Sequence, residues 1–385
     1  MLTRRSVIAV SSLAALVALG VAGAGCSKKV AESEIVIGSF LSLTGSDSTF
    51  GLDTKKGIDL ALEQANAAGG IKGKKIKVIY EDDKSTAAEA TQKVQQLIDR
   101  DKAIAILGEV ASSRTKAGGL VANAKKIPLV TPSSTAVEIT KGRDYVFRSC
   151  FTDAQQGDVA ARFVREKLGK TKVGLFYAAQ DTYSSGLAQT FRESFEKRGG
   201  KIVVSKGFQK GDTNYTTYLQ ELKAGNPEII FAPVYYNEMV PIARQAKQIG
   251  LAGSTFVGGD GWDSAELLEG AAAELEGAYF TNHYAPDVPW EHSKAFMAAF
   301  NAKHKAAPNS LSAQGYDAAR MLFDAISRAS DLTPESIRVA LTQTKDFKGA
   351  TGILTIDAER NANKPIVVVK ITGNAFKYST EYSSQ

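Results

Sequence analysis

The chain has 385 residues, of which 44% are hydrophobic. This is enough to bury sizeable cores and, at roughly 150 residues per domain, predicts about two domains. Its formal net charge of +6 would permit contact with nucleic acid, but the lysines and arginines are scattered among acidic residues along helical segments. We interpret these charges as a solvated surface and expect no nucleic-acid partner.

The N-terminus has the pattern of a secretory signal. A pair of arginines precedes an almost uninterrupted apolar run from Val7 to Ala24, and Cys26 follows before the chain turns polar. A basic segment, an apolar segment and small residues at a cleavage site are the three parts of a signal peptide. The sequence therefore predicts a signal peptide over residues 1–26 and a tether over residues 27–33.

The end of this signal, Ala24-Gly25-Cys26, resembles a bacterial lipobox, in which cleavage leaves the cysteine as a diacylated N-terminus. Gly23 departs from that pattern, because an aliphatic residue usually stands there. An uncleaved membrane anchor is the alternative, since about 18 apolar residues can just span a bilayer. We favour lipidation of Cys26, because a thiol followed by a short polar tether has little use in a plain anchor.

From Glu34 onward, short apolar strands alternate with amphipathic helices in two series, which predicts an α/β protein with two doubly wound, Rossmann-like lobes. The first series is predicted as strands at 35–40, 75–80, 103–107, 127–130 and 145–150, with helices at 57–67 and 87–98 and one between the third and fourth strands. The second is predicted as helices at 155–168, 185–197, 215–223, 238–249 and 264–275, with strands at 172–177, 201–204, 228–233, 255–257 and 278–281. Three helices then follow at 290–305, 311–328 and 334–344, with strands at 352–356 and 365–371.

Small hydroxyl residues gather at two neighbouring strand ends within residues 103–140. The first strand runs into Ser112 and Ser113, and the second into Thr131 and the segment 133–135. In an open α/β sheet, ligands bind at the carboxyl ends of strands, where loop N–H groups and a helix N-terminus capture anions. Each serine alone has an ordinary alternative as a helix N-cap. The two clusters together predict a site for an anionic group such as a carboxylate.

Several enzyme and cofactor motifs are absent from the sequence. No G-x-G-x-x-G follows the first strand, and no phosphate-binding loop, nucleophile elbow, H-E-x-x-H helix or zinc-spaced cysteine pair occurs. The acids of Glu81-Asp82-Asp83 are adjacent rather than opposed, so they suit a turn better than acid/base catalysis. Cys150 is expected to be a small buried hydrophobe. We therefore expect a binding protein with no catalytic residues, no cofactor and no metal.

Motifs along the whole chain resemble the periplasmic solute-binding proteins of branched-chain amino acid ABC transporters. The stretches that carry the resemblance are 37–45, Phe50-Gly51, 67–73, Gly108 with Ser112, 130–135, 151–157 and 256–262. The resemblance covers about residues 34–377, and it implies a type I periplasmic binding fold whose two lobes are joined by three hinge crossovers and close over a ligand. It places lobe 1 at 34–152 plus 284–357, and lobe 2 at 153–283 plus 358–385.

The resemblance also implies roles for individual residues. In the family, the ligand's carboxylate is held by side chains that match Ser112 and Thr135, and its amine by a backbone carbonyl that matches Ser133 and by an acid that matches Asp260. Glutamate is common at the last position, so the aspartate here is one methylene shorter. The chemistry agrees, because a zwitterion needs donors at one end and a carboxylate or another acceptor at the other.

Five further residues are candidates for ligand contact. Tyr183 and Tyr235 match aromatic cleft positions of the family, and Phe50 and Tyr284 are candidates for the side-chain pocket. Each aromatic residue has an alternative role in packing. Asp153 is a candidate too, with helix N-capping as an equal alternative.

The resemblance implies an extracytoplasmic, lipid-anchored monomer that hands an aliphatic amino acid to the permease subunits of an ABC importer. A second hypothesis is a sensor, because regulators and receptor domains share this fold. Relatives also bind amides, urea or aromatic acids. An acid at position 260 favours an α-amino acid, since it would repel a ligand that carries only a carboxylate. The sequence does not decide among aliphatic side chains, because one methylene in an apolar pocket changes affinity by only about 1–3 kcal/mol.

Overall fold

The computed structural model describes residues 34–252 and 255–383. The predicted signal peptide, the tether and Cys26 lie outside the described residues. Within the described part of the chain, no helix is both long and apolar enough to cross a bilayer.

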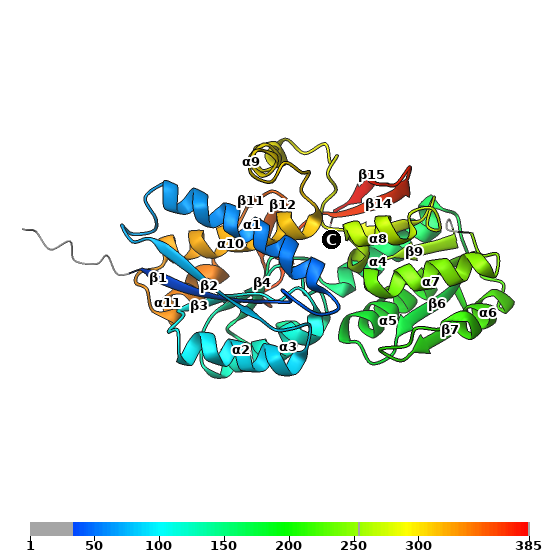
Figure 1. Cartoon of the computed structure of the whole chain (residues 1–385), viewed down its shortest axis with the longest axis horizontal. Coiled ribbons are helices and arrows are strands. Elements are labelled where there is room, and N and C mark those ends of the chain that lie inside the picture. The colour runs from blue at the N-terminus through cyan, green and yellow to red at the C-terminus, as the bar shows by residue number, and fades with distance from the viewer. Residues whose placement is uncertain (1–33, 253–254, 384–385) are drawn as a thin grey trace, which may run out of the picture. The chain divides into compact units, whose positions relative to one another are not determined.

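Five parallel strands form the first sheet, in the order β2-β1-β3-β4-β5 (Figure 1). They are β1 (Ile35–Leu41), β2 (Ile76–Asp82), β3 (Ala105–Leu107), β4 (Leu129–Thr131) and β5 (Val146–Arg148). The helices on them are α1 (Ser48–Ala67), α2 (Ala87–Asp99), α3 (Ser112–Ala124) and, from later in the chain, α10 (Ser310–Arg328). Figure 1 shows α2 and α3 on one side of the sheet and α1 and α10 on the other. Strand β3 is fully buried because both faces of the sheet are covered.

Seven strands form the second sheet, in the order β15-β14-β10-β9-β8-β6-β7. They are β6 (Lys172–Ala178), β7 (Lys201–Phe208), β8 (Ile229–Ala232), β9 (Phe256–Gly258), β10 (Tyr279–Asn282), β14 (Ile366–Thr372) and β15 (Ala375–Tyr382). Its helices are α4 (Asp153–Arg162), α5 (Thr182–Lys197), α6 (Thr216–Ala224), α7 (Tyr236–Gln248) and α8 (Ala265–Ala271). The strands from β6 to β10 are parallel, whereas β14 runs antiparallel to β10 and to β15.

Along the described residues, the chain passes between the two sheets three times: after β5, after β10 and just before β14. The second passage leads to α9 (Lys294–His304), α10 and α11 (Pro334–Thr342). A small sheet of β11 (Phe347–Gly349), β12 (Gly352–Ile356) and β13 (Ala362–Asn363) precedes the third passage. The predicted architecture of two α/β lobes joined by three crossovers is confirmed.

Helix α1 begins at Ser48, nine residues before the helix predicted from Gly57. Two glycines in this helix allow close packing against neighbouring backbone. A Cβ atom on Gly57 would lie 1.9 Å from the carbonyl oxygen of Ser312 in α10, and one on Gly51 would lie 2.1 Å from that of Ser42. Helix α1 therefore packs against α10 and the end of β1 with almost no side chain between the backbones.

The hairpin partner β15 was not predicted as a strand. Its residues alternate between half-buried and exposed positions, so the segment lacks the continuous apolar run by which the other strands were found. Antiparallel strands at a sheet edge commonly have this pattern, because one face is solvated.

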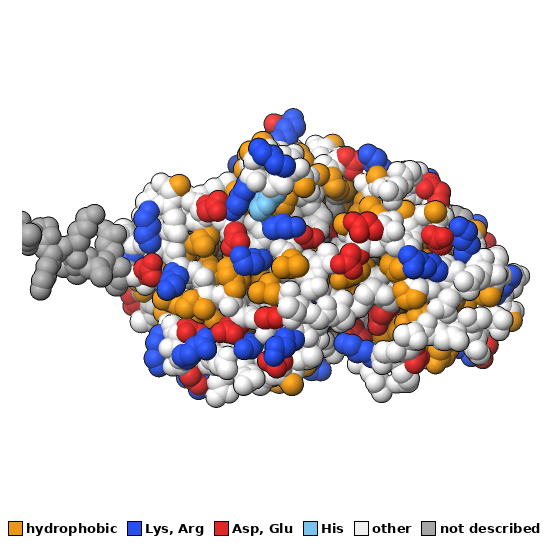
Figure 2. Space-filling view, viewed as in Figure 1, with side chains coloured by type: hydrophobic (Ala, Val, Ile, Leu, Met, Phe, Trp, Pro, Cys, Tyr) orange, Lys and Arg blue, Asp and Glu red, His pale blue; other side chains and the backbone are white. Residues whose placement is uncertain are grey.

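Charged side chains of both signs are interspersed over the face of the molecule shown in Figure 2. No single-sign patch dominates that face, as expected of a solvated surface.

Candidate functional site

A small cavity lies between the carboxyl ends of the strands of the two sheets. The predicted ligand-contact residues line it, except for Asp153 and Tyr284. The complete lining is Phe50, Val110, Ser112, Ser133, Thr135, Tyr183, Tyr235, Asp260, Gly261 and Leu311.

Hydroxyl and amide donors occupy the side of the cavity that belongs to the first sheet. Ser112 is the first residue of α3, and its Oγ accepts a hydrogen bond from the N–H of Ala136 at 3.2 Å, so its own hydroxyl proton remains available. Thr135 is 1% exposed, and its Oγ1 has no hydrogen-bond partner among the described residues. Within that part of the chain its N–H also has no acceptor. The hydroxyl of Ser112 and the N–H of Thr135 present unused donors to the cavity, as an anion site requires.

Asp260 occupies the opposite side of the cavity, at the start of a 3-10 turn (Asp260–Trp262) that follows β9. Its Oδ1 accepts a hydrogen bond from Nε2 of Gln156 at 2.8 Å, and its Oδ2 lies 3.1 Å from Nε2 of His283. Both contacts fix the orientation of the carboxylate. Asp260 is 8% exposed, so an incoming cation would meet it with little competing water.

The histidine beside Asp260 is neutral. His283 is fully buried and stacks on Phe151, with ring centroids 3.7 Å apart. Burial lowers the pKa of His283 to about 4, against the smaller opposing effect of Asp260. Because a carboxylate can only accept, Nε2 carries the ring proton and donates it to Asp260. Asp260 therefore gains a hydrogen bond without a formal positive charge to neutralise it.

Asp153 lies behind the lining rather than in it. It is the first residue of α4, and its N–H donates to the carbonyl of Thr135 at 2.7 Å. Burial raises the pKa of Asp153 well above its ordinary value, and the nearby charge of Asp260 adds to that effect. The N-cap of α4 is Thr152, so Asp153 does not fill the capping role considered above.

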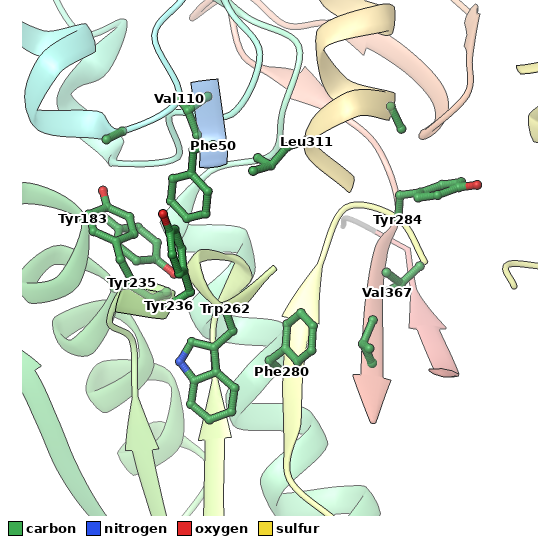
Figure 3. Packing of buried hydrophobic residues seen from close by; sticks show 14 of the residues in the cluster. Phe50, Val110, Tyr183, Tyr235, Tyr236, Trp262, Phe280, Tyr284, Leu311 and Val367 are labelled. Carbon is green, nitrogen blue, oxygen red and sulfur yellow. The ribbon is translucent and has the colours of Figure 1, made fainter. Parts of the chain in front are cut away.

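Three aromatic rings line the cavity, those of Phe50, Tyr183 and Tyr235 (Figure 3). Tyr183 and Tyr235 stack at 5.1 Å with an interplanar angle of 10°, and Phe50 meets Tyr235 edge-on at 5.6 Å. The hydroxyl of Tyr183 accepts a hydrogen bond from the N–H of Gly261 at 3.1 Å. Figure 3 shows Phe50 reaching toward the two tyrosines from the opposite side of the cavity.

Tyr284 lies apart from this group in Figure 3. It is fully buried, and its ring packs edge-on against Phe296 of α9 at 6.3 Å. Tyr284 comes just after β10, close to the second crossover, and was therefore predicted to face the ligand. At this position the chain has already turned toward α9.

Several residues of the site were not predicted from the sequence. Val110, Gly261 and Leu311 line the cavity, whereas Gln156, His283 and Gln314 support it. Val110 and Gly261 adjoin predicted residues, so a wider window around each motif would have found them. Leu311 and Gln314 come from α10, far along the chain, and no local pattern marks them.

Gln314 fixes the loop after β4 from the side of α10. Its Nε2 donates to Oγ of Ser133 at 3.2 Å and to Oγ of Ser310 at 3.1 Å. This amide therefore joins the loop that carries two lining residues to a helix beyond the second crossover.

Nothing in the described part of the chain suggests a metal site, since no group of three or more His, Cys, Asp or Glu side chains there is placed to hold an ion. Cys150 is fully buried, as predicted, and burial raises the pKa of its thiol to about 12. A thiol with so high a pKa is a poor nucleophile at neutral pH.

Hydrogen bonds also join the two sides next to the cavity. Nδ2 of Asn237 in α7 donates to the carbonyl of Ser46 at 3.2 Å and to Oδ1 of Asp47 at 3.1 Å. The N–H of Ser310 in α10 donates to Oδ2 of Asp263 at 2.9 Å. These bonds connect the two sides of the molecule beside the cavity.

A model of the periplasmic binding protein family matches residues 34–375, which is most of the chain. The chain belongs to the periplasmic binding protein family. Among relatives of this binding protein, a Pseudomonas aeruginosa protein described as an amino acid binding protein is 34% identical over 236 residues, covering 61% of this chain and 63% of that protein. A second P. aeruginosa protein, which binds leucine, isoleucine, valine, threonine and alanine, is 28% identical over 88% of this chain and 90% of its own length.

Solved structures of family members share the fold of this binding protein. A leucine binding protein from Thermotoga maritima has a TM-score of 0.86 and 34% identity over 91% of this chain and 99% of its own. A branched-chain amino acid binding protein from Streptococcus pneumoniae, in complex with isoleucine, has a TM-score of 0.84 and 34% identity over the same shares. These similarities confirm the predicted family and its type I fold.

A binding protein from Rhodopseudomonas palustris in complex with benzoate has a TM-score of 0.82 at 21% identity, over 91% of this chain and 97% of its own. At that identity the likeness concerns the fold alone. The fold therefore accommodates ligands with and without an amine.

Proposed function

We propose that this protein captures an α-amino acid with an aliphatic side chain and delivers it to the permease of an ABC importer. One observation carries the proposal: unused donors of Ser112 and Thr135 face the carboxylate of Asp260 across a buried cavity. The relatives named above, which bind leucine, isoleucine and valine, support the same ligand class.

The two ends of the cavity match the two charges of a zwitterion. The ligand's carboxylate accepts from the hydroxyls of Ser112 and Thr135 and from the N–H of Thr135, while its ammonium donates to Asp260 and to the carbonyl of Ser133. Hydrogen bonds to charged groups are worth about 1.5–3 kcal/mol each when both partners are satisfied. Because Gln156 and His283 leave Asp260 without a countercharge, the ammonium supplies it.

The aliphatic side chain lies among the apolar groups between the charged ends. Phe50, Val110 and Leu311 approach from one side, and the stacked rings of Tyr183 and Tyr235 from the other. Apolar area removed from water here contributes about 25 cal/mol per Å². A branched aliphatic chain suits this wall, because it presents no polar group that would need a partner.

Ligand binding and closure are one event in this proposal. The carboxylate site belongs to lobe 1, over residues 34–152 and 284–357, and Asp260 to lobe 2, over residues 153–283 and 358–385. A ligand therefore bonds to both ends only when the lobes close by a hinge motion at the three crossovers. Lipidation of Cys26 would keep the protein at the outer surface of the membrane, next to the permease.

Calorimetric titration of the soluble protein starting at Ser27, refolded to remove carried-over ligand, tests the proposal. The ligands are leucine, isoleucine, valine, alanine, phenylalanine, urea, simple amides and benzoate. We expect micromolar or tighter binding of an aliphatic amino acid. Asp260→Asn should weaken it by about 30-fold or more, since breaking a buried charge pair costs at least about 2 kcal/mol.

Asp99→Asn is the matched control, because Asp99 pairs with Lys125 at the surface and exposed pairs contribute little. If no amino acid binds and an amide, urea or benzoate does, the result would favour the alternative ligands. It would contradict the role of Asp260 as the partner of the ligand's ammonium. Such a ligand would leave the buried carboxylate of Asp260 without a countercharge.

A further inference from the structure

A buried arginine lies directly beneath the loop that carries Thr135. Arg148 ends β5 and is 0% exposed. Its Nη1 donates to the carbonyl of Ser134 and its Nη2 to the carbonyl of Ala136, both at 2.9 Å. The guanidinium is therefore hydrogen-bonded to the backbone of the residues before and after Thr135.

The first of these carbonyls belongs to the peptide group that also contains the N–H of Thr135. A positive charge at the carbonyl oxygen draws electron density toward the oxygen and makes the N–H of the same peptide a stronger donor. That N–H has no acceptor within residues 34–252 and 255–383. The charge of Arg148 thus acts on the donor that faces the anionic end of the cavity.

Arg148 forms no ion pair with any described residue, because no carboxylate oxygen lies within 4.0 Å of its nitrogens there. The acids that face it from farther away are Asp153, Glu138 and Asp357. Burial raises the pKa of Asp153 and so favours its neutral form. A buried charge without a partner is costly to a protein, and it is relieved when an opposite charge arrives.

We propose that Arg148 is the buried countercharge for the ligand's carboxylate and makes the site select acids over their uncharged amides. The inference rests on the proposed function, since it concerns the carboxylate end of the same ligand. Arg148 is a positioning residue that acts through the Ser134–Thr135 peptide group, without touching the ligand.

The test compares two ligands and two substitutions. The ligands are the aliphatic amino acid that binds the wild-type protein and its carboxamide, which keeps the ammonium and side chain but lacks the negative charge. Arg148→Met removes the charge and both hydrogen bonds, whereas Arg148→Lys keeps a charge that can reach the same carbonyls. Circular dichroism and thermal unfolding establish that each variant is folded.

We expect Arg148→Met to weaken binding of the acid by about 30-fold or more and that of the carboxamide by less than about threefold. Arg148→Lys should stay within about tenfold of wild type for the acid. An equal loss for both ligands in Arg148→Met would mean that Arg148 only shapes the loop, and it would overturn the inference. So would an unchanged preference for the acid.

If Arg148→Met does not fold, Arg148→Gln replaces it as a neutral residue that still donates to one carbonyl. If neither neutral variant folds, Arg148→Lys decides alone: a folded lysine variant that no longer prefers the acid contradicts the inference, and one that does supports it. Wild-type protein that binds no amino acid would instead overturn the proposed function itself. Failure of the inference alone leaves wild-type binding intact.

Discussion

Asn237 and Asp47 form a hydrogen bond between the two sides of the molecule beside the cavity, with Nδ2 and Oδ1 3.1 Å apart. The other oxygen of Asp47 accepts from Nη1 of Arg114 at 2.6 Å, and Arg114 lies in α3, the helix that begins at Ser112. A contact between the two sides of the molecule is thus connected through the buried charges of Asp47 and Arg114 to the helix that begins at the cavity-lining Ser112.

Asn237→Ala should lower ligand affinity by about three- to tenfold, because it removes a hydrogen bond to a buried carboxylate that exists only when the two sides meet. The loss should lie mainly in a faster dissociation rate. Titration and stopped-flow dissociation measure both quantities. Asn301→Ala, an exposed change in α9, is the control. An unchanged dissociation rate in the Asn237 variant would show that this bond does not hold the closed form.

Gly57→Ala should destabilise the protein by about 1–3 kcal/mol, because its Cβ would lie 1.9 Å from the backbone oxygen of Ser312 and would push α1 away from α10. Gly119→Ala in α3 is the matched change. Its Cβ would lie 3.4 Å from a methyl group of Val146, so the gain in helix propensity of up to about 1 kcal/mol should dominate. Denaturant unfolding measures the free energy of unfolding of each variant. Similar changes in that free energy for the two variants would contradict this account of the α1–α10 contact.

The protein should lose stability as the pH rises from about 4 to about 8 through the titration of Asp83. Burial, aided by the charge of Glu109, raises the pKa of Asp83 to about 8 from an ordinary value of 3.8. Across that window the folded state holds a proton that the unfolded state has released, so the free energy of unfolding falls as the pH rises. Ser42 shows how close the acids are, since its Oγ lies 2.8 Å from Asp83 and 3.0 Å from Glu109.

Asp83→Asn removes that titration and should flatten the difference in stability between pH 5 and pH 8. Urea unfolding at both values measures it. Glu359→Gln, an exposed carboxylate, is the control and should leave the slope unchanged. If the slope survives in Asp83→Asn, the proton resides on another group of the cluster.

Two tyrosine-to-phenylalanine changes should have different effects on the ligand-free protein. Tyr183→Phe leaves the buried N–H of Gly261 without its acceptor, which costs about 1–3 kcal/mol. Tyr235→Phe removes a hydroxyl that has no hydrogen-bond partner among the described residues, so it should change stability by less than about 1 kcal/mol. Thermal unfolding compares them. A large loss in Tyr235→Phe would indicate that this hydroxyl does find a partner in solution.

Local patterns in the sequence predicted the part of the site that lies at the carboxyl ends of strands. Ser112 and Thr135 follow buried parallel strands, and such strands end at one edge of their sheet, so their meeting at a cavity follows from topology. Asp260 and the aromatic residues were predicted from the resemblance to a family. An acid in a turn and three separate aromatic residues form no sequence pattern that would by itself indicate a binding site.

The supporting residues could not be predicted, because their partners are distant in the sequence. Gln156 reaches Asp260 over 104 positions, and Gln314 reaches Ser133 over 181. The position of Tyr284 outside the cavity has a similar cause. The direction in which a chain leaves a strand depends on the element that it packs against next. Here that is α9, whose Phe296 contacts the ring.

The last strands of the chain determine when the second sheet can be completed. Strand β14 pairs with β10, with Val369 opposite Phe280, and β15 pairs with β14. A ribosome must therefore synthesise residues up to about 372 before β10 loses its open edge, although strands β6 to β9 of that sheet are made by residue 258. Nascent chains that stop short of β14 expose an unpaired strand of the kind that promotes aggregation, so truncation of the C-terminal hairpin should affect yield before it affects affinity.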